Sequence, residues 1–521
     1  MSGVQTTANR SSAMMARDLQ SRPTFSAFLP RSQNVALPFE FERVELAPST
    51  SIGGSNRQQI KIPLPKYGLL YSLELQVTLQ ITAGTSDSGT PDNIKFPEGI
   101  FANIVDRVEL MNSAGVKMGT LHGESFGFFD IMTNKLPPNE KEQLCHLHNY
   151  TLPENRVNDI ARAVDAKNGE MLPKVFRCKL PFWCLDNPST CLPMAYLSGE
   201  TYVVITFNDL NLCGIDNSGF TGVQVVKSDL SGFEFPTAIS ASSVTDRKVQ
   251  FVQNGLHSDD TLNNSNHAVC LQATYVRLPD AHMQIYQAAV MSGPVEYPSA
   301  TQEKQVIRLN LKKKTYTSHD RAVAFKLDSL PGLCTEIMFA LYQTKHRRAG
   351  SGATTNDWMR NCVKLTNIEL RGSGKSLFGK PITHEELKHF VQPQQYGYSH
   401  SKHDEYLRAT SNTGNTTADV IAAKADAQHQ RLISQLQQAR VEENVYIYSF
   451  SLSPSRPELN HGAVSITELH GFELLVDIPD AGITEGVETP FELLVLTNNR
   501  GIIRTDVLSN SLLGLQELKE L

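Results

Sequence analysis

The sequence predicts an all-β protein that contains two related β domains in tandem. Short runs of alternating apolar and polar residues, separated by turns rich in Gly, Ser, Asp and Pro, occur along most of the 521 residues. Helical patterns are few, and one segment of the first half resembles a segment of the second half. Many short strands with turn signals between them are typical of β-sandwiches and β-barrels.

Strand patterns begin near Phe39 and continue through the first half of the chain. In 59–81, apolar residues occupy alternate positions on both sides of a Pro-Lys-Tyr-Gly bend, which predicts a half-buried strand and then a second, longer one. The other strands expected in this half are 39–46, 105–111, 175–182, 201–210, 249–253 and 268–278.

The second half continues this pattern and contains the clearest helical segment. The expected strands are 304–311, 321–327, 336–343, 363–370, 445–452, 471–478 and 491–505. Shorter helical patterns occur at 159–166 and 280–291. Residues 416–444 favour a helix by composition, with an apolar stripe that includes Ile421, Leu432 and Leu436. Because this segment lies between strands, we expect a helical insertion in a loop.

A long-range internal repeat relates the two halves. Residues 108–129 and 368–390 each contain a Val/Ile-Glu-Leu strand, a Ser/Gly turn with a lysine, an apolar step and a Glu-bearing segment that ends in Phe. Ile368 lies 260 residues after Val108, which is half of the chain. The expected organisation is an N-terminal arm at 1–36, a first β domain at 37–285, a second at 286–505 with the helical loop insertion at about 405–444, and a C-terminal tail at 506–521.

The stretch Gly-Ser-Gly-Lys-Ser at 372–376 raises the question of a nucleotide-binding loop. A P-loop requires a glycine five residues before Gly374, where this chain has Glu369, whose carboxylate would face the phosphates. In the repeat, the counterpart of this stretch is Asn-Ser-Ala-Gly-Val-Lys at 112–117. We therefore interpret it as a hairpin turn in which glycine supplies a positive φ and lysine faces solvent.

Charge and apolar content exclude several functional classes. The net charge of −6 argues against a protein that coats nucleic acid, and we expect no direct sequence-specific nucleic-acid binding. The chain has no run of 18 apolar residues, and its N-terminus lacks the apolar region of a secretory signal. The eight cysteines form no Cys-x-x-Cys pair, so we interpret them as small buried hydrophobes of a protein made in a reducing compartment.

No pattern of catalytic or metal-binding residues stands out. Gly372-Ser373-Gly374 lacks the spacing of a nucleophile elbow, and the histidines at 146, 148, 384, 400 and 403 match no established ligand spacing. Glu385 and Glu386 are adjacent in a predicted helical turn, where they could act as capping groups. The sequence therefore predicts a protein that is not an enzyme and has no catalytic residues, cofactor or metal.

Three segments carry a resemblance to a known family. The bend of the first segment, 59–79, contains Pro65 and Gly68. The second and most specific segment, 177–207, contains Leu180, Pro181, Phe182, Trp183, Asn187, Pro188, Leu192 and Pro193. The third, 445–478, contains Tyr448, Phe450 and Pro454, but the glycine and asparagine that follow in the family are displaced here. In this order the segments resemble the double jelly-roll major capsid proteins of large eukaryotic DNA viruses, virophages and tailless phages.

The resemblance implies a fold and a role. The fold would be two tandem eight-stranded jelly rolls, with the helical loop insertion in the second. Three chains would form a homotrimer, a pseudo-hexagonal capsomer that tiles an icosahedral virion shell. The implied partners are neighbouring capsomers and minor capsid or penton proteins, with assembly in the host cytoplasm or nucleus. Exposed apolar residues are then expected on a lone chain.

The N-terminal arm has two interpretations under this resemblance. Its arginines at 10, 17, 22 and 31 could meet the headgroups of an internal membrane or a minor capsid protein. Disorder of the arm is the alternative.

A second function remains open, namely a carbohydrate-binding jelly-roll attachment protein or minor capsid protein. Many lectins are jelly rolls, so the fold alone does not separate the two functions. A sugar site usually needs exposed aromatic platforms, and the chain has two tryptophans, Trp183 and Trp358. Trp183 falls in a predicted core strand, which argues against its use as a platform.

Overall fold

The structure, a computed structural model, describes segments throughout both halves of the chain. The described residues are 39–49, 58–82, 94–95, 100–133, 174–186, 191–197, 199–208, 210, 215–216, 248–251, 268–279, 295–312, 321–327, 329–344, 362–396, 444–451, 462–478, 488–505 and 512–517. The arm at 1–36, the helical patterns at 159–166 and 280–291, and residues 405–443 of the expected helical insertion lie outside them.

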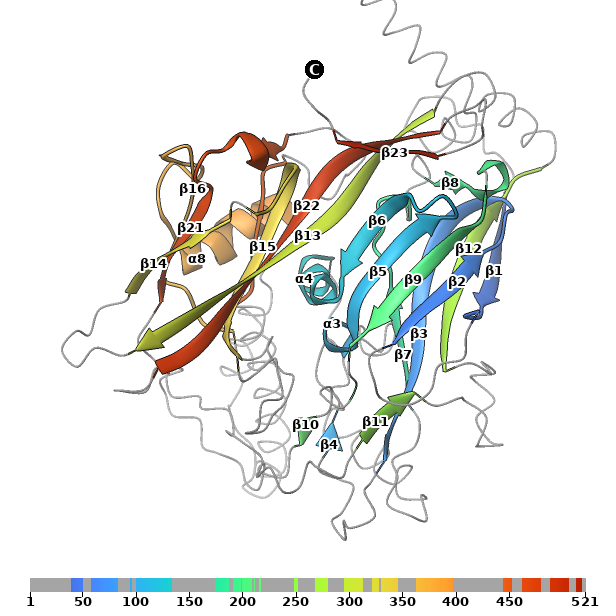
Figure 1. The fold of residues 1–521 in the computed structure, drawn as a ribbon, viewed down its shortest axis with the longest axis horizontal. Helices are drawn as coiled ribbons and strands as arrows, with labels where there is room; N and C mark the ends of the chain where they lie inside the picture. Colours follow the sequence, from blue (N-terminus) through green and yellow to red (C-terminus); the bar gives the residue numbers. More distant parts are fainter. Residues whose placement is uncertain are drawn as a thin grey trace, which may run out of the picture.

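The first half forms two antiparallel sheets that pack face to face (Figure 1). Sheet 1a has the order β1–β12–β3, and β7, β8 and β11 also pair with β3. Its strands are β1 (Glu40–Leu46), β3 (Leu69–Thr82), β7 (Lys174–Lys179), β8 (Leu192–Pro193), β11 (Lys248–Phe251) and β12 (Val269–Arg277). Sheet 1b has the order β2–β9–β5–β6. Its strands are β2 (Gln59–Leu64), β5 (Val105–Asn112), β6 (Lys117–His122) and β9 (Thr201–Phe207). A separate two-stranded ladder joins β4 (Ile94–Lys95) to β10 (Ile215–Asp216).

The second half repeats this arrangement. Sheet 2a has the order β13–β22–β15–β19, with β20 paired to β15 and β23 paired to β22. Its strands are β13 (Val295–Lys312), β15 (Leu333–Gln343), β19 (Tyr446–Ser449), β20 (Val464–Ser465), β22 (Glu488–Thr505) and β23 (Leu512–Glu517). Sheet 2b has the order β14–β21–β16–β17, with β18 paired to β16. Its strands are β14 (Arg321–Lys326), β16 (Asn367–Gly372), β17 (Lys375–Ser376), β18 (Ile382–Thr383) and β21 (Glu473–Ile478).

The strand order is the same in both halves. The main strands of the first half are β1, β2, β3, β5, β6, β7, β9 and β12, and those of the second are β13, β14, β15, β16, β17, β19, β21 and β22. Numbered one to eight in chain order, each set forms one sheet from strands 1, 8, 3 and 6 and another from strands 2, 7, 4 and 5. Two antiparallel four-stranded sheets connected in this way form an eight-stranded jelly roll. The prediction of two tandem all-β units is therefore confirmed, although the predicted boundary at 285 and 286 lies outside the described residues.

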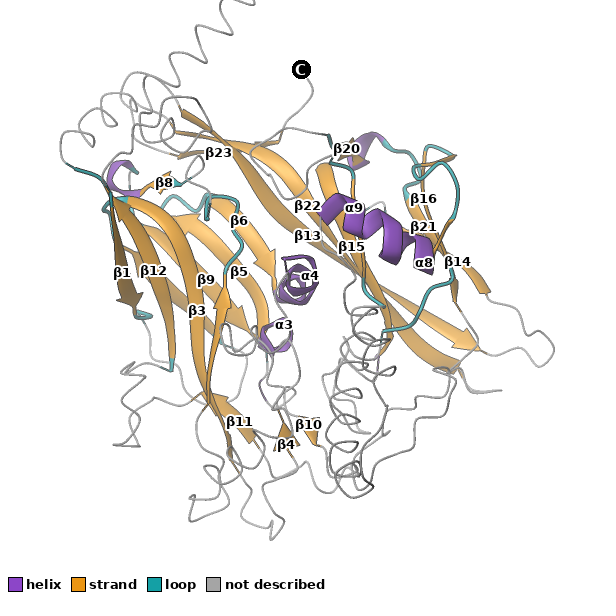
Figure 2. Ribbon diagram, turned by 180° about the vertical axis from the view of Figure 1, so that it is seen from behind, coloured by secondary structure: helices purple, strands orange, loops and turns teal. Residues whose placement is uncertain are grey.

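Most of the short helical segments occupy equivalent places too. In the first half, α4 (Gly123–Thr133) follows the β5–β6 hairpin, and α3 (Ile100–Ile104), which has no counterpart among the described elements of the second half, precedes β5. In the second half, α8 (His384–Glu386), η7 (Leu387–Val391) and α9 (Gln392–Tyr396) follow one another after the β16–β17 hairpin and β18. We call this continuous segment the 384–396 helix (Figure 2). Two single turns, η2 (Met194–Tyr196) and η8 (Ile466–Glu468), follow β8 and β20.

The Gly-Ser-Gly-Lys-Ser stretch is a hairpin, as predicted. Gly372 pairs with Lys375 across the turn, and the two residues between them, Ser373 and Gly374, have φ values of 52° and 75°. Two successive positive φ values are typical of a two-residue hairpin turn. Glu369 lies in β16, where its carboxylate is 2.9 Å from the Arg371 guanidinium. The stretch therefore has hairpin geometry rather than the strand-to-helix geometry of a phosphate-binding loop.

Each jelly roll has its own apolar core. The alternation predicted in 59–64 is present, since Ile60, Ile62 and Leu64 of β2 are buried and the residues between them are exposed. The first core lies between sheets 1a and 1b, and the second lies between sheets 2a and 2b. The six described cysteines are buried, as expected: Cys178, Cys184, Cys191, Cys270, Cys334 and Cys362.

One pair of strands contributes to both cores. β13 and β22 pair without a break from Val295↔Thr505 to Lys312↔Glu488, and this ribbon runs between the two halves (Figure 1). At one end, Tyr297 and Ile503 are buried in the first core. At the other end, Leu311 and Phe491 are buried in the second core. The ribbon thus ties the two jelly rolls together.

Several predicted boundaries were wrong. β13 begins at Val295 and not at 304, because pairing with β22 makes a strand of residues that have no clear alternation. Pro298 is tolerated there, since β13 is the edge strand of sheet 2a. β16 begins at Asn367 and not at 363, and β7 ends at Lys179, so that Trp183 lies in a turn after the strand. α3, α4 and the β23 strand within the expected tail were not predicted.

Candidate functional site: the junction between the jelly rolls

The two jelly rolls meet where helices of the first half cover sheet 2a of the second. α3 and α4 lie between the halves in both views (Figures 1 and 2). Ala102 of α3 and Phe128 of α4 share a buried cluster with residues of sheet 2a and of the segments beside it. These are Met338, Ala340, Tyr342, Cys362, Val445, Ile447, Leu494 and Leu496. Sheet 2a is therefore buried on both faces, one in its own core and one in this junction.

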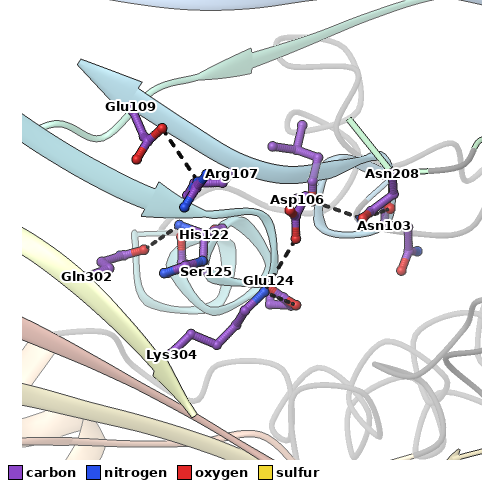
Figure 3. Close-up of polar contacts among 11 residues, drawn as sticks. Asn103, Asp106, Arg107, Glu109, His122, Glu124, Ser125, Asn208, Gln302 and Lys304 are labelled. Carbon is purple, nitrogen blue, oxygen red and sulfur yellow. Dashed lines mark hydrogen bonds and ion pairs between the residues drawn. The ribbon is translucent and has the colours of Figure 1, made fainter. Parts of the chain in front are cut away.

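A charged cluster borders the apolar junction (Figure 3). Lys304 Nζ of β13 lies 3.1 and 3.3 Å from the two carboxylate oxygens of Glu124 in α4, and 3.6 Å from Asp106 Oδ1 in β5. The Lys304 side chain is only 18% exposed and that of Glu124 only 4%. Charges this shielded from water are costly unless they are paired. Each jelly roll therefore supplies the partner that the other requires.

A backbone hydrogen bond strengthens the same contact. The His122 backbone N–H, at the end of β6, donates to Gln302 Oε1 of β13 over 2.9 Å. Ser125 Oγ donates back to the His122 carbonyl over 2.6 Å, which fixes the start of α4 against β6. Burial, with the nearby positive charge of Lys304, lowers the pKa of the His122 imidazole to about 4. The ring is thus neutral near pH 7.

The first-half side of the junction is held in place by further polar contacts (Figure 3). Asn208, just after β9, donates from Nδ2 to the carbonyls of Asn103 and Val105, over 2.9 and 3.3 Å. Glu109 of β5 is buried and lies 2.6 Å from Lys117 Nζ of β6. These contacts fix α3, β5 and β6, which present Asp106, His122 and Glu124 to the second half.

The residues of the junction have a structural role, which is to hold the two jelly rolls together. Within the described residues, no group of three His, Cys, Asp or Glu side chains is placed to hold a metal ion. Among these same parts of the chain, no helix is both long and apolar enough to cross a bilayer. The charged groups at the junction pair with one another, and this arrangement fixes the orientation of the two jelly rolls.

The sequence-predicted motif residues lie elsewhere, and the structure brings two of the motifs together. Leu69, next to Gly68, pairs with Pro193, and Met194 N–H donates to the Gly68 carbonyl over 3.1 Å. Gly68 has a φ of 61°, and a Cβ there would lie 2.8 Å from the Val276 carbonyl oxygen. This bend therefore requires glycine twice over, for its conformation and for its space.

The most specific motif forms part of the first core. Leu180, Phe182, Trp183 and Leu192 are buried there, and Pro65 and Pro181 are half-buried. Trp183 Nε1 donates to the Met118 carbonyl over 2.6 Å. A buried, hydrogen-bonded indole is not available as a platform for a sugar ring, which removes this residue from the carbohydrate-binding alternative.

The third motif belongs to the second half. Tyr448 and Phe450 are half-buried, and the centroids of their rings lie 5.3 Å apart. The centroid of the Phe378 ring lies 4.4 Å from that of the Tyr448 ring. Asn187, Pro188, Pro454 and the second tryptophan, Trp358, lie outside the described residues.

The junction residues were not identified from the sequence. Glu124 was noticed only as part of the repeat, and Lys304 and Gln302 carried no motif. Lys304 and Glu124 are 180 residues apart, so no local spacing could connect them. A signal was present in the apolar run of 493–496, because a strand without alternation is typically buried on both faces and needs a cover on each.

Comparison with known proteins agrees with this architecture. No family model and no curated protein matches the sequence. Among solved structures, the chain is similar to PBCV-1 VP54 as fitted into a reconstruction of the virophage Sputnik, with 12% identity, a TM-score of 0.52, and 94% of this chain and 99% of the other covered. It is similar to the structure of the Sputnik virophage itself, with 12% identity, a TM-score of 0.51 and coverage of 94% and 92%. For the Faustovirus major capsid protein the identity is 9%, the TM-score 0.50 and the coverage 91% and 92%.

The strand order within each half and the similarity over nearly the whole chain thus lead to one conclusion: this protein has the double jelly-roll fold of viral major capsid proteins.

Proposed function

We propose that the chain is a major capsid protein of a DNA virus, and that three copies assemble into a pseudo-hexagonal capsomer of an icosahedral shell. The observation that carries this proposal is the pair of topologically equivalent jelly rolls, fixed side by side by the junction around Lys304 and Glu124. Three such chains contribute six similar barrels, and six barrels in a ring fill a hexagonal lattice position. A shell subunit needs this rigidity, because its contacts must be presented at fixed angles.

The exposed apolar residues support an assembling protein. Among the described residues, the large apolar side chains on the surface are Phe39, Phe41, Val306 and Phe390. Aromatic residues are enriched in the buried centres of protein interfaces. The similar solved structures include the Faustovirus major capsid protein and the Sputnik virophage. This similarity supports a structural rather than an enzymatic role and a place in the virion. Further proposed partners are neighbouring capsomers, minor capsid or penton proteins and, for the arm at 1–36, an internal membrane.

The mass of the purified chain in solution tests the proposal. The monomer mass is 57.7 kDa. We expect light scattering after size exclusion to give about three times that mass, unchanged on dilution, and electron microscopy to show a pseudo-hexagonal outline. A stable monomer that no capsid partner converts into a larger species would contradict the proposal. A glycan array would then test the carbohydrate-binding alternative.

A further inference from the structure

The equivalence of the two jelly rolls suggests where copies of the chain meet. Inside one chain, the helix that follows the β5–β6 hairpin covers the outer face of sheet 2a through Phe128. Each of these surfaces has a counterpart in the other half. The counterpart of α4 is the 384–396 helix, and the counterpart of the outer face of sheet 2a is the outer face of sheet 1a.

Each of the two helices has one apolar residue in the core of its own half and an aromatic residue outside that core. α4 directs Phe126 into the first core and Phe128 into the junction. The 384–396 helix directs Leu387 into the second core, whereas Phe390, three residues later, is 64% exposed. In the repeat, Leu387 corresponds to Phe126, and Phe390 corresponds to Phe129, the neighbour of Phe128. The helix that supplies a junction residue in one half thus has a counterpart that carries an exposed aromatic residue in the other.

The outer face of sheet 1a carries the matching apolar surface. In β1, Val44 and Leu46 face the first core, so Phe41 lies on the opposite side, where it is 58% exposed. Its ring lies 5.4 Å from that of Tyr71 and 5.2 Å from that of Phe39. Tyr71 packs on a small apolar cluster, separate from the core, that consists of Leu69, Cys191, Val276 and Leu278. We call Phe39, Phe41 and Tyr71 the sheet 1a patch.

The 384–396 helix is held firmly enough to act as an interaction element. Gln392 Nε2 donates to the Ile447 carbonyl over 3.0 Å. Gln395 donates to the Ser449 carbonyl over 2.8 Å and accepts from the Ser449 N–H over 3.0 Å. Thr383 caps the N-terminus by accepting from the Glu386 N–H over 3.1 Å. Phe390 is therefore presented on a fixed support, which reduces the entropy lost on binding.

From these surfaces we infer that copies of this chain associate head to tail, with Phe390 of the 384–396 helix of one copy packed on the sheet 1a patch of the next copy. This contact would repeat between chains the contact that α4 and sheet 2a make within the chain. It joins two different surfaces and is therefore heterologous, so it closes into a ring when the rotation between copies allows. The inference rests on the proposed function, and it names the surfaces through which the trimer forms.

Two single variants and their mixture test the inference. Phe41→Arg alters only the patch, and Phe390→Arg alters only the helix; both residues are exposed, so we expect each variant to fold, as circular dichroism would check. Each variant alone should have the mass of a monomer, 57.7 kDa, in analytical ultracentrifugation. In a ring built from one variant, every contact between neighbouring copies contains the altered surface. An equimolar mixture should form a species of about twice that mass, since one copy keeps an intact helix and the other an intact patch. Val306→Arg, at an exposed apolar residue outside both surfaces, should stay at the wild-type mass.

The outcomes separate the inference from the proposed function. If the wild type is trimeric and both arginine variants remain trimeric, the inference is wrong and the proposed function stands. If both variants are folded monomers but their mixture gives no heterodimer, the head-to-tail pairing of these two surfaces is likewise wrong. A wild-type chain that is itself monomeric would instead contradict the proposed trimer.

Discussion

Lys304 Nζ lies 3.1 Å from Glu124 Oε1, and this ion pair joins the edge strand of one jelly roll to the first turn of a helix in the other. Both groups are largely shielded from solvent. Pairs of this kind contribute little net free energy compared with apolar replacements, but removal of one partner alone is strongly destabilising. The pair therefore fixes how the two jelly rolls fit together.

Lys304→Met should lower the free energy of unfolding by about 3 kcal/mol, because it leaves the Glu124 carboxylate buried without its main partner. Unfolding in denaturant measures the change. The double variant Lys304→Met/Glu124→Leu should recover most of the loss, since neither charge then remains. As a control, Lys375→Met at the exposed hairpin should change stability by less than about 0.5 kcal/mol. A double variant no more stable than the single one would show that the pair is not the source of the effect.

Gly68→Ala should destabilise the chain more than Gly374→Ala does. Both glycines have a positive φ, of 61° and 75°, so each substitution incurs a conformational cost of about 1–2 kcal/mol. A Cβ at Gly68 would in addition lie 2.8 Å from a backbone oxygen, whereas one at Gly374 would meet nothing within 4 Å. We expect the two melting temperatures to differ accordingly. Equal losses would mean that the bend at Gly68 moves to accept the methyl group.

Stability should fall as the pH drops from about 6.5 to 4. The pKa of His122 is lowered in the folded state to about 4, so the unfolded chain binds a proton at this ring over that range while the folded chain does not. Protonation thus favours unfolding, and the full shift corresponds to about 3 kcal/mol. Lys304, Arg107, Glu124 and Asp106 all act on the ring, and burial is the largest cause.

Denaturant unfolding of the wild type and of His122→Gln at pH 7, 5.5 and 4 isolates this contribution. The difference in stability between pH 7 and pH 4 should be smaller in the variant, because the group that titrates is absent. An identical pH dependence in the two proteins would assign the effect to other groups.

Gln395→Leu should destabilise the chain and promote aggregation. Gln395 satisfies both the N–H and the carbonyl of Ser449, as a neighbouring strand would, and β19 pairs only with β15 among the described strands. The loss of two hydrogen bonds to buried backbone should cost about 1–3 kcal/mol, and it would leave an open strand edge. Turbidity during heating and the unfolding midpoint report the two effects. The exposed neighbour Gln394 provides the control, since Gln394→Leu should leave the unfolding midpoint nearly unchanged.

The sequence predicted most of the strands because their local patterns are informative. The alternation in β2 and the glycine-rich turn after β16 required no knowledge of the rest of the chain. The first nine residues of β13 could not be predicted in this way, because they become a strand only by pairing with β22, about 200 residues later in the chain. For the same reason the residues that join the halves, Lys304 and Glu124, were missed.

Of the short helices, one was predicted from the sequence and another was not. The turn at Glu385 and Glu386 was expected, and Thr383 indeed caps it. α4, in contrast, contains two glycines and several phenylalanines, which have poor intrinsic helix propensity. Its conformation depends on burial of Phe126 and Phe128 in two different apolar clusters, a tertiary effect that local propensity does not contain.

The ribbon of β13 and β22 also determines when the protein can finish folding. Tyr297 and Ile503 fill positions in the first core, so that core is complete only after residue 503 has been synthesised. N-terminal domains commonly fold while synthesis continues, but here the last core contacts of the N-terminal jelly roll come from a strand of the second half. A nascent chain that stops before β22 should therefore be more sensitive to proteases in its N-terminal jelly roll than the chain that contains β22.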